Sequence, residues 1–241
     1  MNSEKQPKKD NGGKIRRFIF GDKSPHEVYR FLINFLYPNI CPCCEEIIDY
    51  NDDFCDKCRN QIVLYNDEFS VVNADHFVAY CAYKGKIRNA IRIFKYEPCG
   101  NSYYAFAFGI VQALRRNQLT NGIDAVTFIP MIKSDERKRG YNQTKLMAKE
   151  IHYLLDIPCI DVLQKIRRTK KQKSMKASER FSNVDGAFDI KPCKYDIKGK
   201  CILVIDDLCT TGSTLSEASR VLKSAGAKTV IAASFAKTSN D

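Results

Sequence analysis

The spacing of hydrophobic positions changes along the chain. In the first half, apolar residues recur every three or four positions, as Val28, Phe31 and Phe35 do, which predicts an amphipathic helix that ends at Pro38. The stretch 77–94 predicts short strands followed by a basic helix, and 103–115 predicts another helix.

After the turn at Asn121-Gly122, short apolar runs alternate with amphipathic helices. The run Cys201–Asp206 is apolar up to its final carboxylate, as in a parallel strand covered on both faces. The other expected strands are 124–130, 157–163 and 228–235, and the expected helices are 141–155 and 213–225. This alternation predicts an α/β fold with a parallel sheet flanked by helices.

Composition narrows the range of partners and compartments. The chain has 241 residues, 44% of them apolar, which suffices for one good core and a small additional module. Its net charge of +11 favours anionic partners such as phosphates or nucleic acid. No apolar run approaches the roughly 20 residues of a membrane-spanning helix, and the start of the chain lacks a signal peptide. We therefore expect a cytoplasmic protein without membrane insertion.

Four of the eleven cysteines form two Cys-x-x-Cys pairs, Cys41/Cys44 and Cys55/Cys58, with ten residues between the pairs. In a reducing compartment such pairs are typical of metal binding, and four thiolates make a closed, structural zinc site. Cys43 is an alternative ligand in the first pair. A chance cluster of free thiols or a redox pair is the competing interpretation, and the remaining cysteines are expected to be small buried hydrophobic residues.

The strand Cys201–Asp206 leads into Asp207 and then into a loop of hydroxyl side chains before the next helix. The loop consists of Thr210, Thr211, Gly212, Ser213 and Thr214. Unpaired N–H groups at a helix N-terminus attract an anion, a glycine allows it to approach the backbone, and hydroxyl groups add donors. Carboxylates at the end of a parallel strand lie where α/β sheets bind ligands, and they can accept hydrogen bonds from ribose hydroxyls.

The simpler interpretation of this segment is an ordinary helix with a serine or threonine N-cap. A cap needs one hydroxyl, whereas this loop offers four. The segment also lacks the Lys-Ser/Thr pair of an ATP-type phosphate loop, so any ATPase or helicase that acts with this chain must be a partner protein.

The Asp206-Asp207 segment with its hydroxyl loop resembles the phosphoribosyl pyrophosphate (PRPP) signature of type I phosphoribosyltransferases. The resemblance implies that the two carboxylates hold the ribose hydroxyls and that the loop holds the 5-phosphate. Around it the chain resembles the ComF family of DNA-uptake (competence) proteins and their GntX relatives, which join a double Cys-x-x-Cys module to such a domain. The likeness extends over about 31–235.

Composition and this resemblance together divide the chain into three parts. We expect a disordered basic tail at 1–22, a helix with the four-cysteine zinc module at 23–75, and a phosphoribosyltransferase-like domain at 76–241. A basic loop at about 165–182 would then be the mobile loop that closes over PRPP. Solvated surface and contact with a nucleic-acid backbone are equally weighted alternatives for this loop.

The family pattern also implies the groups that face pyrophosphate. These are the turn Met131-Ile132-Lys133 and, with Lys133, the side chains of Arg137, Arg139 and Arg180. A magnesium ion bridging ribose and pyrophosphate oxygens is expected with PRPP. Basic residues that close over the leaving group would stabilise its charge.

The cellular role has two competing interpretations. In the first, which we favour, a ComF-like cytoplasmic protein binds PRPP and assists the uptake of single-stranded DNA, which aromatic residues such as Tyr83 and Tyr141 would contact if they are not part of the core. In the second, a metabolic phosphoribosyltransferase transfers the phosphoribosyl group to a nucleobase or amine. Loss of turnover is a third possibility. Glutamine-dependent activity is not expected, because the chain has no glutaminase domain with an N-terminal cysteine.

Overall fold

The computed structural model describes residues 25–96, 102–167, 184–192 and 194–238, which fall into two compact units, 1–38 and 39–241. The first unit contains helix α2, Pro25–Leu36, which ends just before Pro38 as predicted. The predicted tail at 1–22 and most of the predicted mobile loop lie outside the described residues. The expected boundary between 75 and 76 remains a prediction.

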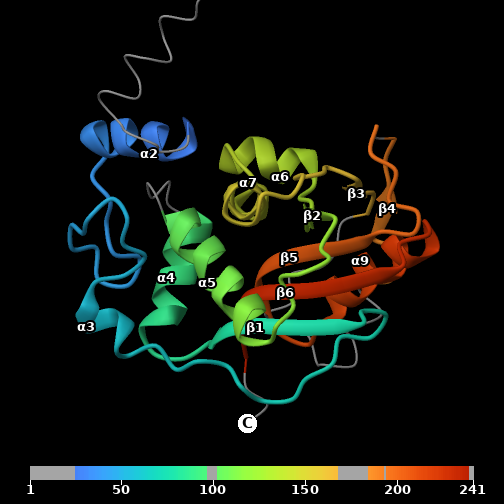
Figure 1. The fold of residues 1–241 in the computed structure, drawn as a ribbon, viewed down its shortest axis with the longest axis horizontal. Coiled ribbons are helices and arrows are strands. Elements are labelled where there is room, and N and C mark those ends of the chain that lie inside the picture. The colour runs from blue at the N-terminus through green and yellow to red at the C-terminus, as the bar shows by residue number, and fades with distance from the viewer. Residues whose placement is uncertain (1–24, 97–101, 168–183, 193, 239–241) are drawn as a thin grey trace, which may run out of the picture. The chain divides into compact units, whose positions relative to one another are not determined.

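The second unit is built on a parallel sheet of the strand order β1-β6-β5-β2 (Figure 1). The strands are β1 (His76–Ala82), β2 (Ala125–Phe128), β5 (Cys201–Cys209) and β6 (Thr229–Lys237). Each neighbouring pair is parallel, and the register pairs Ile205 with Phe128 and Ala233. The predicted α/β fold with a parallel sheet is therefore confirmed.

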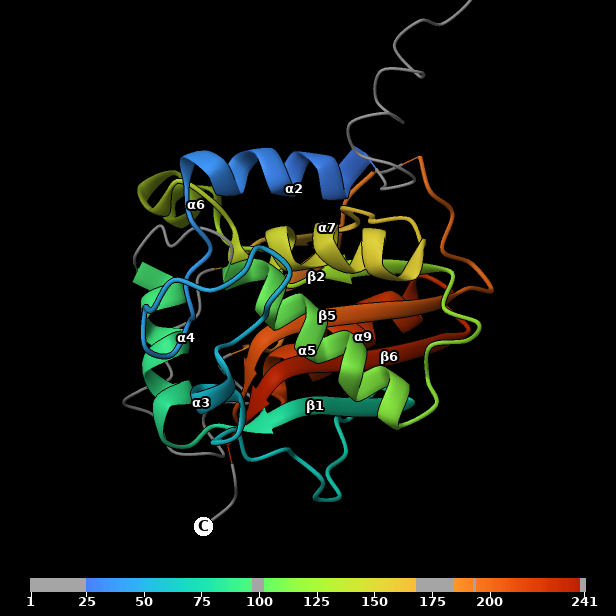
Figure 2. The same cartoon turned by 60° about the vertical axis from the view of Figure 1, so that its left-hand side comes forward.

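Alternate residues of β5 serve two cores, because successive side chains of a strand point to opposite faces. Leu203 and Ile205 belong to one core, and Ile202 and Val204 belong to the other. The first core is covered by α4 (Lys86–Tyr96), α5 (Ser102–Arg116) and α7 (Gln143–Leu155), and the second by α9 (Ser213–Ser224). Figure 2 shows α5 and α7 on the near side of the strands and α9 behind them.

The predicted strand at 157–163 is wrong. Within the described chain its backbone makes one parallel bridge, between Cys159 and Val126, and its last residue, Leu163, begins a separate antiparallel strand. Pro158 has no N–H group to donate, so the segment cannot extend the ladder on that side. The structure instead adds an antiparallel pair, β3 (Leu163–Lys165) with β4 (Phe188–Ile190). It also adds a helix α6 (Lys133–Arg139), which begins at the last residue of the expected turn.

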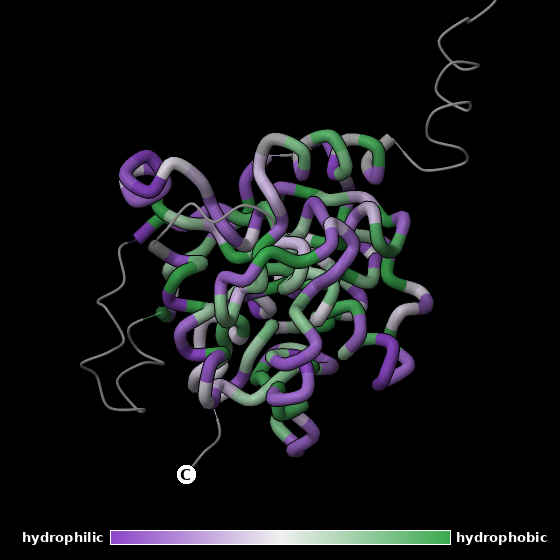
Figure 3. The backbone as a smooth tube through the Cα atoms, turned by 90° about the vertical axis from the view of Figure 1, so that its left-hand side faces the viewer, coloured by the Kyte–Doolittle hydropathy of each residue, from purple (hydrophilic) through white to green (hydrophobic). Residues whose placement is uncertain are grey.

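The cysteine module contains a short helix α3, Asp56–Arg59, and shares the core of the sheet. Phe54 is fully buried and stacks at 6.3 Å between ring centroids on Phe235, which in turn stacks on Phe106 at 4.0 Å. Hydrophobic segments are concentrated inside and polar ones at the turns (Figure 3). Among the helices that can be described, none has the length and apolar character required to cross a bilayer.

Candidate functional site

A cavity of about 430 Å³ opens where β5 and β2 end. The segment after β2, the start of α7 and the loop after β5 line it, together with Lys95 from α4 and Lys165 from β3. Since the carboxyl ends of parallel strands are where open α/β sheets bind ligands, this is the expected place for a site. The predicted residues that line the cavity are Arg139, Asp206, Asp207, Thr210, Gly212, Ser213 and Thr214.

The hydroxyl loop is shaped by Gly212, which is the N-cap of α9 and has φ of 80°. A Cβ atom at this position would lie 3.3 Å from both Phe69 and Val71, so both the backbone angle and the space favour glycine. Glycine has no side chain to cap the helix, and α9 has no side-chain cap among the residues described. The simple N-cap interpretation of the hydroxyl residues is therefore wrong. The first N–H groups of α9 lie at the end of the helix that borders the cavity, and no N-cap side chain among the described residues accepts from them.

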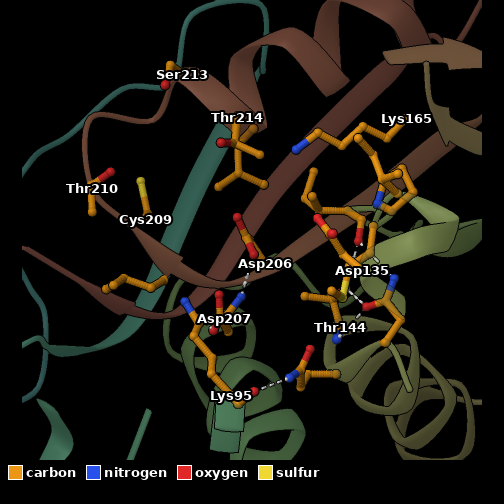
Figure 4. A pocket seen from close by; sticks show the side chains of 18 of the residues that line it. Lys95, Asp135, Thr144, Lys165, Asp206, Asp207, Cys209, Thr210, Ser213 and Thr214 are labelled. Atoms are coloured by element: carbon orange, nitrogen blue, oxygen red, sulfur yellow. Dashed lines mark hydrogen bonds and ion pairs between the residues drawn. The ribbon is translucent and has the colours of Figure 1, made fainter. Parts of the chain in front are cut away.

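The two carboxylates at the tip of β5 have different surroundings. Asp207 is 6% exposed, and its Oδ2 lies 2.8 Å from the Nζ of Lys95. Asp206 is half-buried, and its Oδ1 accepts a hydrogen bond of 2.8 Å from the backbone N–H of Asp207. Figure 4 shows the pair between Thr214 on one side and Lys95 on the other.

Electrostatics separate these carboxylates further. Burial raises the pKa of Asp206 well above 3.8, repulsion by Asp207 adds to the effect, and Lys95 offsets part of it. Burial lowers the pKa of Lys95, but attraction by Asp207 and Asp206 outweighs it and leaves that pKa raised. Lys95 is therefore the cation that compensates the paired acids.

The C-terminal end of α4, which carries Lys95, is fixed by side chains of α7 and α6. The Nε2 of Gln143 donates to the carbonyl oxygens of Lys95 at 3.1 Å and Phe94 at 3.4 Å. Its Oε1 accepts a hydrogen bond of 2.9 Å from Arg139. Arg139 thus lines the cavity and also orients the residue that holds Lys95 in place.

The start of α7 is tied to the end of β2. Asn142 caps the helix by accepting hydrogen bonds from the N–H groups of Thr144 and Lys145, and its Nδ2 donates to the carbonyl oxygen of Ile129 at 3.3 Å. The hydroxyl of Thr144 also donates to Ile129, at 2.7 Å. These bonds hold a second helix N-terminus at the rim of the same cavity.

Several predicted site residues lie elsewhere. Lys133 lines a neighbouring cavity of about 410 Å³, and Thr211 lies in the loop without lining the main cavity, its Oγ1 3.1 Å from the hydroxyl of Ser213. Arg137 lines neither of these cavities, and its Nε donates to the carbonyl oxygen of Lys133 at 3.4 Å. Arg180 lies outside the described residues.

Sequence reasoning missed the residues that reach the cavity from distant segments. Neither Lys95 nor Gln143 belongs to a sequence motif. The one local signal is that Lys95 lies at the end of an amphipathic basic helix. Lys165 lies beside the carboxylates, where burial lowers its pKa and Asp206 and Asp135 act in the opposite direction. Asp135 also lines the cavity and adds a carboxylate on the side where pyrophosphate was expected.

The four predicted zinc ligands converge. The sulfur atoms of Cys41, Cys44, Cys55 and Cys58 all lie within 4.8 Å of one another, and those of Cys44 and Cys55 are 3.6 Å apart. Four thiolates about 2.3 Å from a tetrahedral zinc ion have this spacing, so the residues fit the metal and leave no open position. This geometry indicates a structural zinc centre.

Cys43 stands outside this set and is buried. A hydrogen bond with Cys43 lowers the pKa of the Cys41 thiol, and the same contact raises the pKa of Cys43. The set of four converging sulfur atoms is thus complete without Cys43. A further cation, Lys86 at the start of α4, lies 3.5 Å from the sulfur of Cys58.

Comparison with known families identifies two segments. Residues 145–240 match the phosphoribosyl transferase domain, and residues 32–71 match the double zinc ribbon domain. Among solved structures, a purine phosphoribosyltransferase from Pyrococcus horikoshii Ot3 aligns with 20% identity over 56% of this chain and 73% of that chain, at a TM-score of 0.35. The fold assignment rests on the strand order and the matched domains, and not on this likeness.

The curated relatives include competence proteins and DNA utilization proteins. Competence protein F of Haemophilus influenzae is 30% identical over 108 residues, which is 44% of this chain and 47% of that protein. Competence protein ComFC of Bacillus subtilis is 37% identical over 98 residues, 41% of this chain and 38% of that protein. The DNA utilization protein YhgH of Salmonella typhi is 29% identical over 108 residues, 44% of this chain and 46% of that protein. The matched part thus spans about half or less of the length of each relative.

Proposed function

Because this chain is a ComF-family, phosphoribosyltransferase-like protein with a double zinc ribbon, we propose that its main cavity binds PRPP. The observation that carries the proposal is the juxtaposition of the α9 N-terminus with the paired carboxylates of β5. The first offers N–H and hydroxyl donors to a 5-phosphate, and the second offers acceptors to ribose hydroxyls.

The diphosphate of PRPP would lie toward the segment after β2. Arg139 and Lys165 line the cavity and supply positive charge, while Asp135 supplies a carboxylate. A magnesium ion bound chiefly through the substrate would reconcile that carboxylate with the diphosphate, because Mg²⁺ is held by a few carboxylates together with phosphate oxygens. We propose magnesium as the cofactor of this site, alongside the structural zinc.

The cellular role that we propose is the handling of single-stranded DNA during uptake, in the cytoplasm and together with a separate ATPase. The competence-related relatives and the net charge of +11 support this role. The alternative, a metabolic phosphoribosyltransferase, shares the same cavity and requires in addition a place for an acceptor.

Titration calorimetry with ribose 5-phosphate tests the ligand directly. We expect ribose 5-phosphate to bind and unphosphorylated ribose to bind at least about tenfold more weakly, since a charged hydrogen bond contributes about 1.5–3 kcal/mol. Ser213→Ala, at the cavity, should weaken binding of the phosphorylated sugar. Ser224→Ala, exposed at the other end of α9, is the matched control and should not. Equal affinity for the two sugars would refute the proposed site.

The DNA role has its own measurement. Fluorescence anisotropy with a labelled dT oligonucleotide should show binding that weakens steeply as salt rises, because bound phosphates release counterions. Absence of binding at low salt would leave PRPP binding intact and remove direct contact with DNA from the proposal.

A further inference from the structure

A third cavity, of about 420 Å³, adjoins the main cavity at Lys95. We name it the α4 groove. Lys95 and Leu208 line both this groove and the main cavity, so only these two side chains are common walls. The remaining walls that matter here are Tyr83, which follows β1, and Arg88, Asn89 and Arg92 of α4.

The charge of the groove comes from one face of α4. Arg88, Arg92 and Lys95 recur at intervals of four and three residues, and such positions share a helix face. The adjoining face, with Ile87, Ile91 and Phe94, is buried in the core, and Ile91 also lines the groove. The groove therefore presents three cations side by side.

Neither arginine of the groove is neutralised within the described chain. The Nε of Arg88 donates to the carbonyl oxygen of Tyr83 at 3.2 Å, and Arg92 donates to the Oδ1 of Asn89 at 2.8 Å. Both acceptors are uncharged, and among the described residues no aspartate or glutamate lines the groove. Both arginines are exposed, and neither has a carboxylate partner among the described residues. Their guanidinium groups are therefore open to an anionic ligand, and the planar fork of arginine matches a carboxylate.

An aromatic ring stands beside this charge. Tyr83 is half-buried, and the guanidinium carbon of Arg88 lies 5.8 Å from the centroid of its ring. A flat ring with a planar guanidinium group beside it favours a planar ligand over a bulky aliphatic one.

We infer that the α4 groove is the acceptor subsite and that it takes a planar nitrogen compound that carries a carboxylate. This inference rests on the proposed PRPP site, since it places the second reactant next to the ribose held by Asp206 and Asp207. Lys95, which is common to both cavities, lies between the acid pair and the acceptor.

The reaction that this arrangement supports is a displacement at C1 of the sugar. The nitrogen lone pair of the acceptor forms the new bond to C1 while the bond from C1 to the diphosphate oxygen breaks. Both electrons of that bond leave with pyrophosphate, and any proton on the nitrogen passes to solvent. Binding the acceptor through its carboxylate leaves its nitrogen to be oriented toward C1.

Matched pairs of probes test the inference. Nicotinate with nicotinamide, orotate with uracil and anthranilate with aniline differ chiefly in the carboxylate. Their binding to the zinc-loaded full chain is measured by calorimetry in the presence of saturating ribose 5-phosphate and magnesium. We expect at least one acid to bind about tenfold or more tightly than its neutral partner, as one charged hydrogen-bonded pair allows.

Substitutions locate the effect. In the double variant Arg88→Gln/Arg92→Gln the preference for the acid should fall to within about twofold, whereas Arg115→Gln, an exposed arginine of α5, should leave it unchanged. Zinc content and melting temperature confirm that the double variant is folded. If every acid binds no better than its neutral partner, or if the preference survives in the double variant, the inference is wrong.

Two further outcomes separate this inference from others. If ribose 5-phosphate fails to bind the natural chain, the proposed function fails, whatever the acids do. If the acids show no preference but a dT oligonucleotide binds and loses affinity in the double variant, the groove is a nucleic-acid contact and the acceptor inference is overturned.

Discussion

The two carboxylates of β5 are neighbours in the chain, yet they point to opposite faces of the sheet. Because side chains alternate along a strand, Asp207 continues the face of Leu203 and Ile205 and meets Lys95 of α4. Asp206 continues the opposite face, toward the start of α9, as Figure 4 shows. A pair that looks redundant in sequence is therefore two distinct groups.

Removal of Lys95 should show how much free energy the burial of these carboxylates costs. Lys95→Met leaves the carboxylate of Asp207 without its cation, and we expect a loss of about 3 kcal/mol in the free energy of unfolding. Urea unfolding measures it. Lys84→Met, an exposed lysine just before α4, should change stability by less than about 0.5 kcal/mol.

A double substitution decides whether charge is the cause. Adding Asp207→Asn to Lys95→Met removes the unpaired carboxylate and should restore part of the lost stability. If the double variant is no more stable than Lys95→Met alone, the loss arises from packing and the electrostatic explanation fails.

Neutralising Asp206 should stabilise the ligand-free protein. The folded state raises the pKa of this carboxyl above its usual 3.8, so ionised Asp206 opposes folding, and this cost grows as the pH rises from 3.8 through the raised pKa. Asp206→Asn should therefore raise stability at pH 7 by on the order of 1 kcal/mol, or about 2–4 °C in Tm, while weakening ribose 5-phosphate binding.

The pH dependence of this gain is its control. Below pH 3.8 both the folded and the unfolded state carry the proton, so the difference between Asp206→Asn and the natural chain should shrink as the pH falls. Scanning calorimetry from pH 4 to pH 8 measures it. A gain that is constant with pH would show that ionisation of Asp206 is not responsible.

At the scale of elements, the junction between β5 and α9 depends on one glycine. Gly212→Ala forces a side chain into a backbone with φ of 80° and brings its Cβ to 3.3 Å from Phe69, so we expect a loss of about 2–3 kcal/mol and weaker phosphate binding. Thermal unfolding and calorimetry check both effects.

Gly122 provides the matched control. Its φ is 82°, and an added Cβ would have no heavy atom within 4 Å. Gly122→Ala should therefore cost only the backbone strain, about 1 kcal/mol, and leave ribose 5-phosphate binding intact. Equal losses in the two variants would mean that crowding by Phe69 has no role.

The elements with strong local signals could be predicted from the sequence. The continuous apolar run of β5, the hydroxyl loop after it and the four clustered cysteines each carry their chemistry within a few adjacent residues. The β3–β4 pair could not be predicted in this way, because each strand has three residues and depends on a partner distant in the chain. The false strand at 157–163 has the right apolar content, and only the absence of an N–H group at Pro158 argues against it.

The residues of the candidate site also differ in whether a local sequence pattern predicts them. The loop and the carboxylates belong to one segment and were predicted together, whereas Lys95 and Gln143 reach the cavity through tertiary packing. Their pairing is a property of how α4 lies against α7 and β5, and no local pattern encodes it. Arg137 lines neither of the two cavities at this edge of the sheet and donates to the backbone of Lys133, so its role toward pyrophosphate stays a prediction.

For the whole molecule, the important feature is that the cysteine module and the sheet share one core. Phe54 lies between zinc ligands in sequence and stacks on Phe235 of β6. Phe54→Ala should therefore cost about 3–5 kcal/mol and lower the melting temperature of the entire second unit. Ile47→Ala, 75% exposed in the same module, should cost less than about 0.5 kcal/mol.

Metal release tests the same coupling. Zinc release, followed with a chromogenic chelator, and loss of far-UV circular dichroism should occur at the same temperature, because the metal site and the sheet unfold together. We expect about one zinc ion per chain before heating. Release well below the unfolding transition would show that the module opens independently of the sheet.

The opposite orientation of Asp206 and Asp207 has a consequence for how such proteins diversify. Substitutions around α4 reach the sugar through Lys95 and Asp207, whereas substitutions around α9 reach it through Asp206 and the phosphate loop. Substitutions on one face of the sheet can thus change the specificity for the acceptor. The residues that bind the phosphorylated sugar on the other face can meanwhile remain unchanged. In proteins that share this fold by descent, we expect the arginines of α4 to change together with the acceptor compound that each protein uses.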